Sequence, residues 1–238
     1  MIVSAHQPAY LPWLGYFDKI AQSDVFVLFD DVQFEKNSFT NRNLIKTATG
    51  PSWLTVPVKA GRHIDRTMIG LEIANEHQWK DKHLKAIIQN YRKAPHFSFC
   101  YPHLLALFES DDATLLELCD RHLAFWLKQL EITTSVRPLS TLGLQSRKST
   151  LVLDACLALK ADRYISGALG RDYLDLAAFS AAGISVEFQR FVHPRYSQLY
   201  GDFVPNLSII DFWMNTGPGA AAAFRQQRLA RSDPRRRE

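Results

Sequence analysis

The sequence predicts an α/β fold, with a mostly parallel sheet, flanking helices and a helical insertion in the middle of the chain. Short apolar runs alternate with helical patterns near both ends of the 238-residue chain, as they do in βαβ units. Between them, residues 74–132 place apolar residues at helical spacing instead. No linker rich in Gly, Ser or Pro divides the chain, so we expect a single domain over residues 1–224.

The first βαβ unit contains an unusual loop. Residues 2–5 are typical of a short buried strand, residues 16–21 of a helix and residues 25–29 of a second strand. The loop between the first strand and the helix packs two prolines, a histidine and several aromatic residues together. Open α/β folds bind ligands beside the loops that leave the carboxyl ends of their strands. We therefore expect this loop to present side chains to a ligand.

The remaining elements follow from the same periodicities. Residues 52–59 predict a third strand, in which Pro57 favours an edge position or a strand end, and residues 66–73 predict a further short strand. In the insertion, helices are expected at 76–91 and 113–132, with an aromatic connector at 91–103 and Asp111 or Asp112 capping the second helix. The later expected elements are a strand at 133–139, a helix at 149–159, a strand at 163–166, a helix at 174–182, a strand at 184–191 and a last helix at 208–215.

The positive charge of the chain is concentrated at its end. The net charge is +4, and residues 225–238 contain six arginines and two acids, so the rest of the chain is neutral. A neutral body argues against a broad phosphate-binding face, and we expect no nucleic-acid partner. We expect the basic segment to be a disordered polar tail, although an interaction arm is the alternative.

Cysteine usage and hydropathy indicate the compartment. The three cysteines are widely spaced, and none forms a pair with metal-ligand spacing, so we expect free thiols, no disulfide and no metal site built on them. No leader peptide is apparent, and no apolar stretch is long enough to insert into a membrane. These features predict a cytoplasmic protein, and they leave its oligomeric state and any cofactor unknown.

Two histidines are the candidate catalytic residues. His6 directly follows the first strand, and an imidazole titrates near neutrality, so it can act as an acid or a base. His193 follows the last predicted strand and can reach the same edge of the sheet. The alternatives are a core histidine bonded to a carbonyl for His6, and a residue that fixes the Pro194 turn for His193.

The candidate substrate-binding residues lie in polar or glycine-containing loops. Asp30 and Asp31 can hold Mg²⁺ or a sugar hydroxyl, or one of them can cap a turn. Arg42, Lys148 and Arg171 are candidate phosphate ligands, because cations and free N–H groups bind anions. The full set is Gln7, Tyr10, Trp13, Gly15, Tyr16, Lys19, Asp31, Gln33, Asn41, Arg42, Lys148, Ser149, Ser166, Gly167, Arg171 and Tyr173. Tyr10, Trp13 and Tyr16 can stack on a sugar or a base, and we expect at least one of them to serve only packing.

These motifs together resemble a known family. The segments are HQPAYLPWLGYF from residue 6, DVQF from 31, NRN from 41, WLTVPV from 53, YISG from 164, RDYL from 171 and HPRY from 193. They resemble the WbqC-like protein family, and the resemblance covers residues 1–215. It implies a role in surface-polysaccharide (O-antigen) or sugar-nucleotide biosynthesis.

The resemblance and the candidate residues lead to one principal hypothesis. It is a transferase that moves an acyl or aminoacyl group onto an amino-sugar nucleotide, with His6 as general base and a phosphate-bearing small molecule as substrate. The first alternative is nucleotidyl or adenylyl transfer, although Trp13 and Tyr16 stand where the His-x-Gly-His turn of nucleotidyltransferases has histidines. The second alternative is a non-catalytic accessory protein of a glycan-assembly complex.

Overall fold

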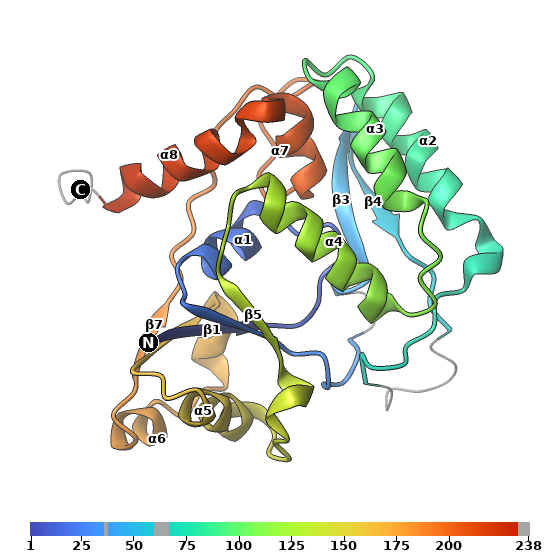
Figure 1. The fold of residues 1–238 in the computed structure, drawn as a ribbon. Helices are drawn as coiled ribbons and strands as arrows, with labels where there is room; N and C mark the ends of the chain where they lie inside the picture. The colour runs from blue at the N-terminus through green and yellow to red at the C-terminus, as the bar shows by residue number, and fades with distance from the viewer. Residues whose placement is uncertain (36–37, 60–66, 233–238) are drawn as a thin grey trace.

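The computed structural model describes residues 1–35, 38–59 and 67–232, and within them it has a five-stranded parallel sheet (Figure 1). The strands lie in the order β5-β2-β1-β6-β7, and each pairs in parallel with its neighbours. Their bounds are Ile2–His6 (β1), Val25–Leu28 (β2), Ser135–Pro138 (β5), Arg163–Ser166 (β6) and Ser185–Phe188 (β7). The predicted α/β class is confirmed.

Helices cover both faces of this sheet (Figure 1). Successive side chains of a strand point to opposite faces. Accordingly, Val3 and Val27 pack with the helices α5 (Lys148–Ala158) and α6 (Leu176–Ala181). Phe26 packs instead in the larger core with α1 (Leu14–Ala21) and α4 (Leu115–Gln129). The two predicted βαβ units, one near each end of the chain, therefore share one sheet. This sheet lies between two layers of helices.

The segment expected to supply a third strand forms a separate hairpin. Arg42–Thr47 (β3) and Gly50–Thr55 (β4) pair antiparallel with each other and with no other strand of the described chain. Residues 67–73 form isolated bridges rather than the expected strand, and residue 66 lies outside the described residues. The hairpin instead packs beside α2 (Trp79–Tyr91) in the upper right of Figure 1.

The predicted aromatic connector is wrong over most of its length, because Phe97–Phe108 forms a helix, α3. Pro102 lies inside this helix, and an internal proline normally argues against one because it removes a backbone hydrogen bond. Burial outweighs that cost here: Cys100 and Leu104 are fully buried, and the Cys100 thiol donates to the carbonyl of Trp213 at 3.3 Å. Tertiary packing has overridden a local signal.

The cap of α4 also differs from the prediction. Thr114 is the N-cap and forms a capping box with Glu117, in which each side chain accepts from the other residue's backbone N–H. Asp112, one of the two expected caps, pairs with Arg121 instead. That ion pair links the segment just before α4 to a residue within the helix.

The C-terminal segment is more ordered than expected. After α7 (Ile209–Thr216), residues Ala220–Ser232 form a helix, α8, so the expected disorder from residue 225 is wrong up to residue 232. Alanine, arginine, glutamine and leucine, which dominate this segment, all favour helices. Residues 233–238 lie outside the described chain. None of the described helices has both the length and the apolar composition that crossing a bilayer requires.

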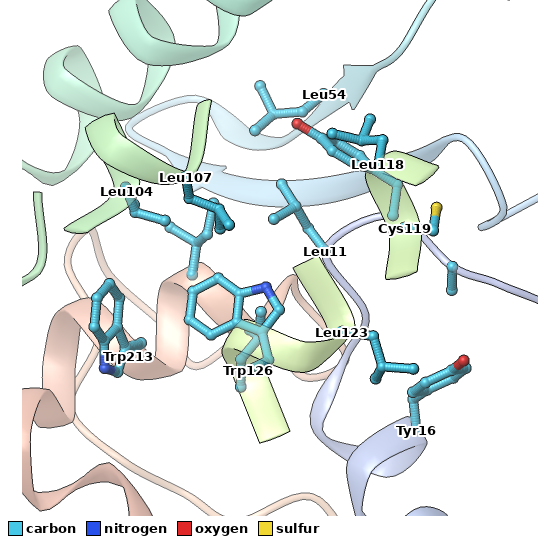
Figure 2. Packing of buried hydrophobic residues seen from close by; sticks show 14 of the residues in the cluster. Leu11, Tyr16, Leu54, Leu104, Leu107, Leu118, Cys119, Leu123, Trp126 and Trp213 are labelled. Carbon is cyan, nitrogen blue, oxygen red and sulfur yellow. The ribbon is translucent and has the colours of Figure 1, made fainter. Parts of the chain in front are cut away.

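The larger core joins the insertion to the sheet (Figure 2). Trp126 of α4 and Trp213 of α7 meet edge to face, with ring centroids 5.2 Å apart. Both rings are almost completely buried, and Leu104 and Leu107 of α3 lie close by (Figure 2). This aromatic contact therefore joins α4 to α7, which comes much later in the sequence.

We expect Trp213→Ala to lower the free energy of unfolding by about 3–5 kcal/mol, because it opens a cavity in this core. Leu157→Ala, on the exposed face of α5, is the control and should change it by less than about 0.5 kcal/mol. Urea unfolding followed by circular dichroism measures both values. A Trp213→Ala variant as stable as the control would contradict the packing described here.

Candidate functional site

The strand order creates a topological switch point between β1 and β6. The chain leaves β1 toward β2 on one side and leaves β6 toward β7 on the other, so the connections diverge at this point. Ligands of open α/β sheets bind at such switch points, outside the carboxyl ends of the strands. Ser4 pairs with Ile165, and continuing this register by two residues places His6 beside Gly167. The crevice expected at this switch point therefore lies between these two residues.

His6 faces helix α1 across the end of β1. Its ring meets Tyr16 and Trp13 edge-on, with centroid separations of 5.0 and 5.8 Å. Its Nδ1 lies 2.9 Å from the carbonyl oxygen of Gln7. Because a carbonyl can only accept, Nδ1 carries the proton and Nε2 carries the lone pair. The imidazole is thus held in the tautomer in which Nε2 can receive a proton.

Lys19 supplies a buried cation beside His6. The side chain is only 3% exposed, and its Nζ donates to the carbonyl of Ala5 at 2.8 Å. No carboxylate among the described residues pairs with it. Its Nζ would lie 3.8 Å from a Cβ built on Gly167, so the ammonium reaches the crevice between β1 and β6. Burial lowers its pKa from 10.5 to about 7, since the charged form loses its hydration.

The two side chains influence each other electrostatically. Burial and, to a smaller extent, the charge of Lys19 together lower the pKa of His6 to about 3, against the raising effect of the hydrogen bond to Gln7. His6 is therefore neutral at physiological pH in the ligand-free protein. An anion bound at Lys19 would cancel the repulsive charge and raise the pKa of His6 toward its ordinary range.

Contacts with the hairpin hold the loop after β1 rigid. Leu11 has a left-handed backbone with φ +46°, which is strained for a side chain other than glycine. Asn43 of β3 donates to its carbonyl at 2.7 Å, and the amide of Tyr10 donates to the carbonyl of Thr40 at 3.0 Å. Strained loops with such support are frequent at functional sites.

Two of the three predicted stacking residues are buried. Tyr10 has no exposed surface, and its hydroxyl lies 2.9 Å from Nδ1 of His83, so it packs the core and cannot stack on a ligand. Tyr16 is 1% exposed, and its hydroxyl donates to the carbonyl of Gln7 at 3.2 Å. Its role is to position Gln7 and His6. Trp13 alone of the three keeps a partly exposed ring.

Gly15 and Gly170 serve close packing. A Cβ on buried Gly15 would lie 2.7 Å from the indole nitrogen of Trp13, so the glycine lets that ring lie across the start of α1. Its predicted contact with substrate stays a prediction. A Cβ on Gly170 would lie 1.9 Å from the hydroxyl of Ser166, which donates to the carbonyl of Gly167. The glycines shape the two loops that border the crevice.

Ser166 and Gly167 lie at the crevice, whereas Arg171 and Tyr173 lie further along the chain. Ser166 is 1% exposed, and Gly167 is partly exposed beside Lys19. The Arg171 guanidinium stacks over Phe188 at 4.1 Å, next to the edge strand β7. Tyr173 is 47% exposed. The predicted phosphate-binding role of Arg171 therefore stays a prediction.

The predicted polar segment after β2 divides into separate roles. Asp30 is buried and accepts from both the backbone and the hydroxyl of Ser140, so it anchors the turn after β5. Asp31 and Gln33 are exposed. Among the described residues, no three His, Cys, Asp or Glu side chains lie close enough together to share a metal ion.

The remaining predicted residues lie at two other places. Asn41 is buried, and its amide donates to the carbonyl of Val56 at 2.9 Å, a structural role rather than contact with substrate. Arg42 begins β3, and its guanidinium stacks over Trp53 at 4.1 Å. Lys148 is exposed at the start of α5, and the hydroxyl of Ser149 accepts from the amide of Asp175.

His193 lies in a different aromatic cluster from His6. Its ring contacts Phe191, Tyr196 and Phe203, with centroid separations of 5.5–6.0 Å. Its Nδ1 lies 2.9 Å from the carbonyl oxygen of Pro194, and its Nε2 is buried without a partner among the described residues. No contact joins it to His6 within the described chain, so the predicted shared site has no support from these contacts.

The sequence prediction missed two aromatic residues near the site. Phe39 contacts Trp13, and Trp53 contacts Phe39, with centroid separations of 5.2 and 5.7 Å. Trp53 belongs to one of the segments that carried the family resemblance, so a signal for it was present. Phe39 lies in a polar segment of the sequence, and strand periodicity does not predict which residues contact it in the fold.

Comparison with known proteins agrees with the resemblance. The model of the WbqC-like protein family matches residues 7–223. A curated relative, "Uncharacterized protein Rv1507c" of Mycobacterium tuberculosis (strain ATCC 25618 / H37Rv), is 34% identical over 221 residues, which cover 92% of this chain and 95% of the relative. No solved structure matches the chain significantly.

We expect Lys19→Met to raise the melting temperature at pH 7, because it removes a buried charge that lacks a carboxylate partner. The pKa of Lys19 is lower in the folded protein than in the unfolded chain, so its destabilising effect is full below pH 7 and disappears as the pH approaches 10.5. The advantage of the variant should shrink by about 1.4 kcal/mol per pH unit within that window.

Urea unfolding of both proteins between pH 7 and 10 checks this expectation. Lys82→Met, at an exposed position of α2, is the matched control and should show no such trend. An advantage that stays constant with pH would mean that the ammonium is not desolvated.

Proposed function

The chain belongs to the WbqC-like protein family, and on this premise we propose that it is an enzyme that binds an anionic, phosphate-bearing small molecule between β1 and β6. The observation that carries the proposal is the buried ammonium of Lys19, which reaches this crevice without a carboxylate partner in the described chain. A buried cation without a counter-ion is destabilising. A phosphate group would supply the missing charge and two or more acceptor oxygens.

We further propose that the reaction is a group transfer in which His6 is the general base. The acceptor is an amino group, and the amino sugar of a sugar nucleotide combines such an amine with phosphates. The amine nitrogen attacks the carbonyl carbon of an acyl or aminoacyl donor, Nε2 of His6 takes the proton that the amine loses, and the donor's leaving group departs with the bonding electrons. The Nδ1–H tautomer supports this role of Nε2.

Binding and catalysis would be coupled through Lys19. Burial, and to a smaller extent the neighbouring ammonium, hold the pKa of His6 too low for an effective base. A bound phosphate would offset the charge of that ammonium, so the proton affinity of His6 would rise when substrate binds. The site would therefore become basic at the moment when the acceptor amine needs a base.

The two alternatives have less support. An accessory protein has no need of a buried lysine beside a histidine in a stiffened loop. Nucleotidyl transfer needs hydrogen-bond donors aimed at a phosphate, and the hydroxyl of Tyr16, at one of the two relevant positions, donates to Gln7 inside the protein. Surface-polysaccharide biosynthesis remains our preferred setting on the family resemblance.

Pyrophosphate is expected to bind and raise the melting temperature of the wild-type protein, since a ligand of the folded state stabilises it by mass action. Binding at pH 8 should also take up protons, because the anion raises the pKa of Lys19 from about 7. Calorimetry in buffers of different ionisation enthalpy measures this uptake. Lys19→Met should lose both the binding and the uptake, whereas Lys82→Met should keep them; binding without proton uptake would argue against Lys19 as the ligand.

The titration of His6 provides a second test of the site. Its pKa should rise when pyrophosphate binds, because the anion offsets the charge of Lys19, and also in Lys19→Met, because that substitution removes the charge. NMR titration of the imidazole resonances, assigned with a His6→Gln variant, measures the shift. A pKa of His6 that responds to neither change would refute the coupling between these residues.

A further inference from the structure

A row of aromatic rings extends from the candidate site across the β3–β4 hairpin. Trp13 contacts His6 at its inner end, Phe39 lies in the middle and Trp53 lies at the outer end. Arg42 stacks over Trp53 at 4.1 Å and adds a positive charge there. We call Trp13, Phe39 and Trp53 the aromatic row. Its members come from two loop segments and a strand that are far apart in sequence but adjacent in the fold.

The aromatic row is unusually exposed. Phe39 is 40% exposed and Trp53 is 42% exposed. A polar residue at either position would therefore leave the packing of the buried core unchanged. Single exposed apolar residues are common, but neighbouring ones beside a site mark a surface that binds something. The rings are tilted to each other by 50–52°, so they do not stack on one another, and Arg42 lies over one face of Trp53. The row can therefore accept another flat ring.

Charge decides which ring suits this surface. Lys19 lies near the inner end of the row and Arg42 lies at its outer end, so cations flank the aromatic surface. In a nucleotide, a sugar links the flat ring of the base to phosphate groups. Such a ligand has both a ring that can stack on the aromatic row and a negative charge that can pair with the flanking cations. A protein partner would need a much larger contact area than two side chains that are about two-fifths exposed.

We propose that the aromatic row is the base-binding subsite for a nucleoside diphosphate whose phosphates lie at Lys19. This proposal rests on the proposed function and deepens it, because it assigns the nucleotide part of the substrate to named residues. Base stacking on aromatic side chains tolerates different bases, so the row contributes affinity more than selection among bases. The proposal also changes which residues we expect to stack on the ligand. These are now Phe39 and Trp53 in place of Tyr10 and Tyr16, which are buried.

The test compares UDP and ADP with pyrophosphate by calorimetry. Wild-type protein should bind the nucleoside diphosphates roughly 5- to 100-fold more tightly than pyrophosphate, as expected for one stacked base. In the double variant Phe39→Leu/Trp53→Leu this ratio should fall several-fold toward one, because the stacked base loses two of the three rings of the row, while the affinity for pyrophosphate stays the same. Phe99→Leu, at an equally exposed position (41%) in α3, is the matched control and should keep the wild-type ratio.

A conservative variant guards against misfolding. Trp53→Phe retains an aromatic face, so it should keep most of the ratio while reducing the quenching of tryptophan fluorescence by bound nucleotide. A nucleotide-to-pyrophosphate ratio near one in wild type, or an undiminished ratio in the double variant, would overturn the subsite while leaving the anion site at Lys19 intact. If pyrophosphate itself fails to bind, the proposed function fails and the subsite with it. A loss of self-association in the double variant, without a change in the ratio, would identify the row as a protein interface.

Discussion

The pairing of β1 with β2 on one side and with β6 on the other is the constraint on which the rest of this structure depends. It places two loops at one edge of the sheet, although their sequences lie about 160 residues apart. It also aligns α1 along β1, because the helix returns the chain antiparallel to the strand. Helix α1 then delivers Tyr16 and Lys19 to the end of the strand that carries His6. The candidate site is a consequence of this topology.

The site is built at the expense of stability. A buried ammonium without a carboxylate partner, a left-handed leucine and a cluster of exposed aromatic side chains each oppose folding. Compensation comes from the larger core, where Trp126 of α4 and Trp213 of α7 pack against each other (Figure 2). Binding sites often show this pattern, because the groups that a ligand needs are poorly satisfied before it arrives.

The insertion contributes more than stability. Its helices pack on the β3–β4 hairpin, and the hairpin in turn fixes the loop after β1 through Asn43 and Thr40. The same hairpin presents Trp53 and Arg42 at the surface. A segment that the α/β pattern treats as an interruption therefore supports the loop that carries the candidate base.

Local patterns were sufficient for much of the fold. The strand at residues 163–166, the helices α1 and α4 and the α/β class follow from apolar periodicity, since one face of each element must be buried. The same reasoning selected His6 and Gly167, because residues at the carboxyl ends of parallel strands meet at one edge. It failed at α3, where an internal proline pointed to a connector, and it missed β3, the antiparallel partner of the strand expected at residues 52–59. In both cases burial against distant residues decided the outcome.

The sequence by itself determined the class of fold, the family likeness and the position of the loop that carries the candidate base. Only the tertiary structure decided which side chains of that loop remain available to a ligand. Tyr10, Trp13 and Tyr16 look equivalent along the chain, yet the core takes up Tyr10 and Tyr16 and leaves Trp13 beside Phe39. Burial of an aromatic ring depends on what packs against it, and those neighbours come from helices and strands far away in sequence.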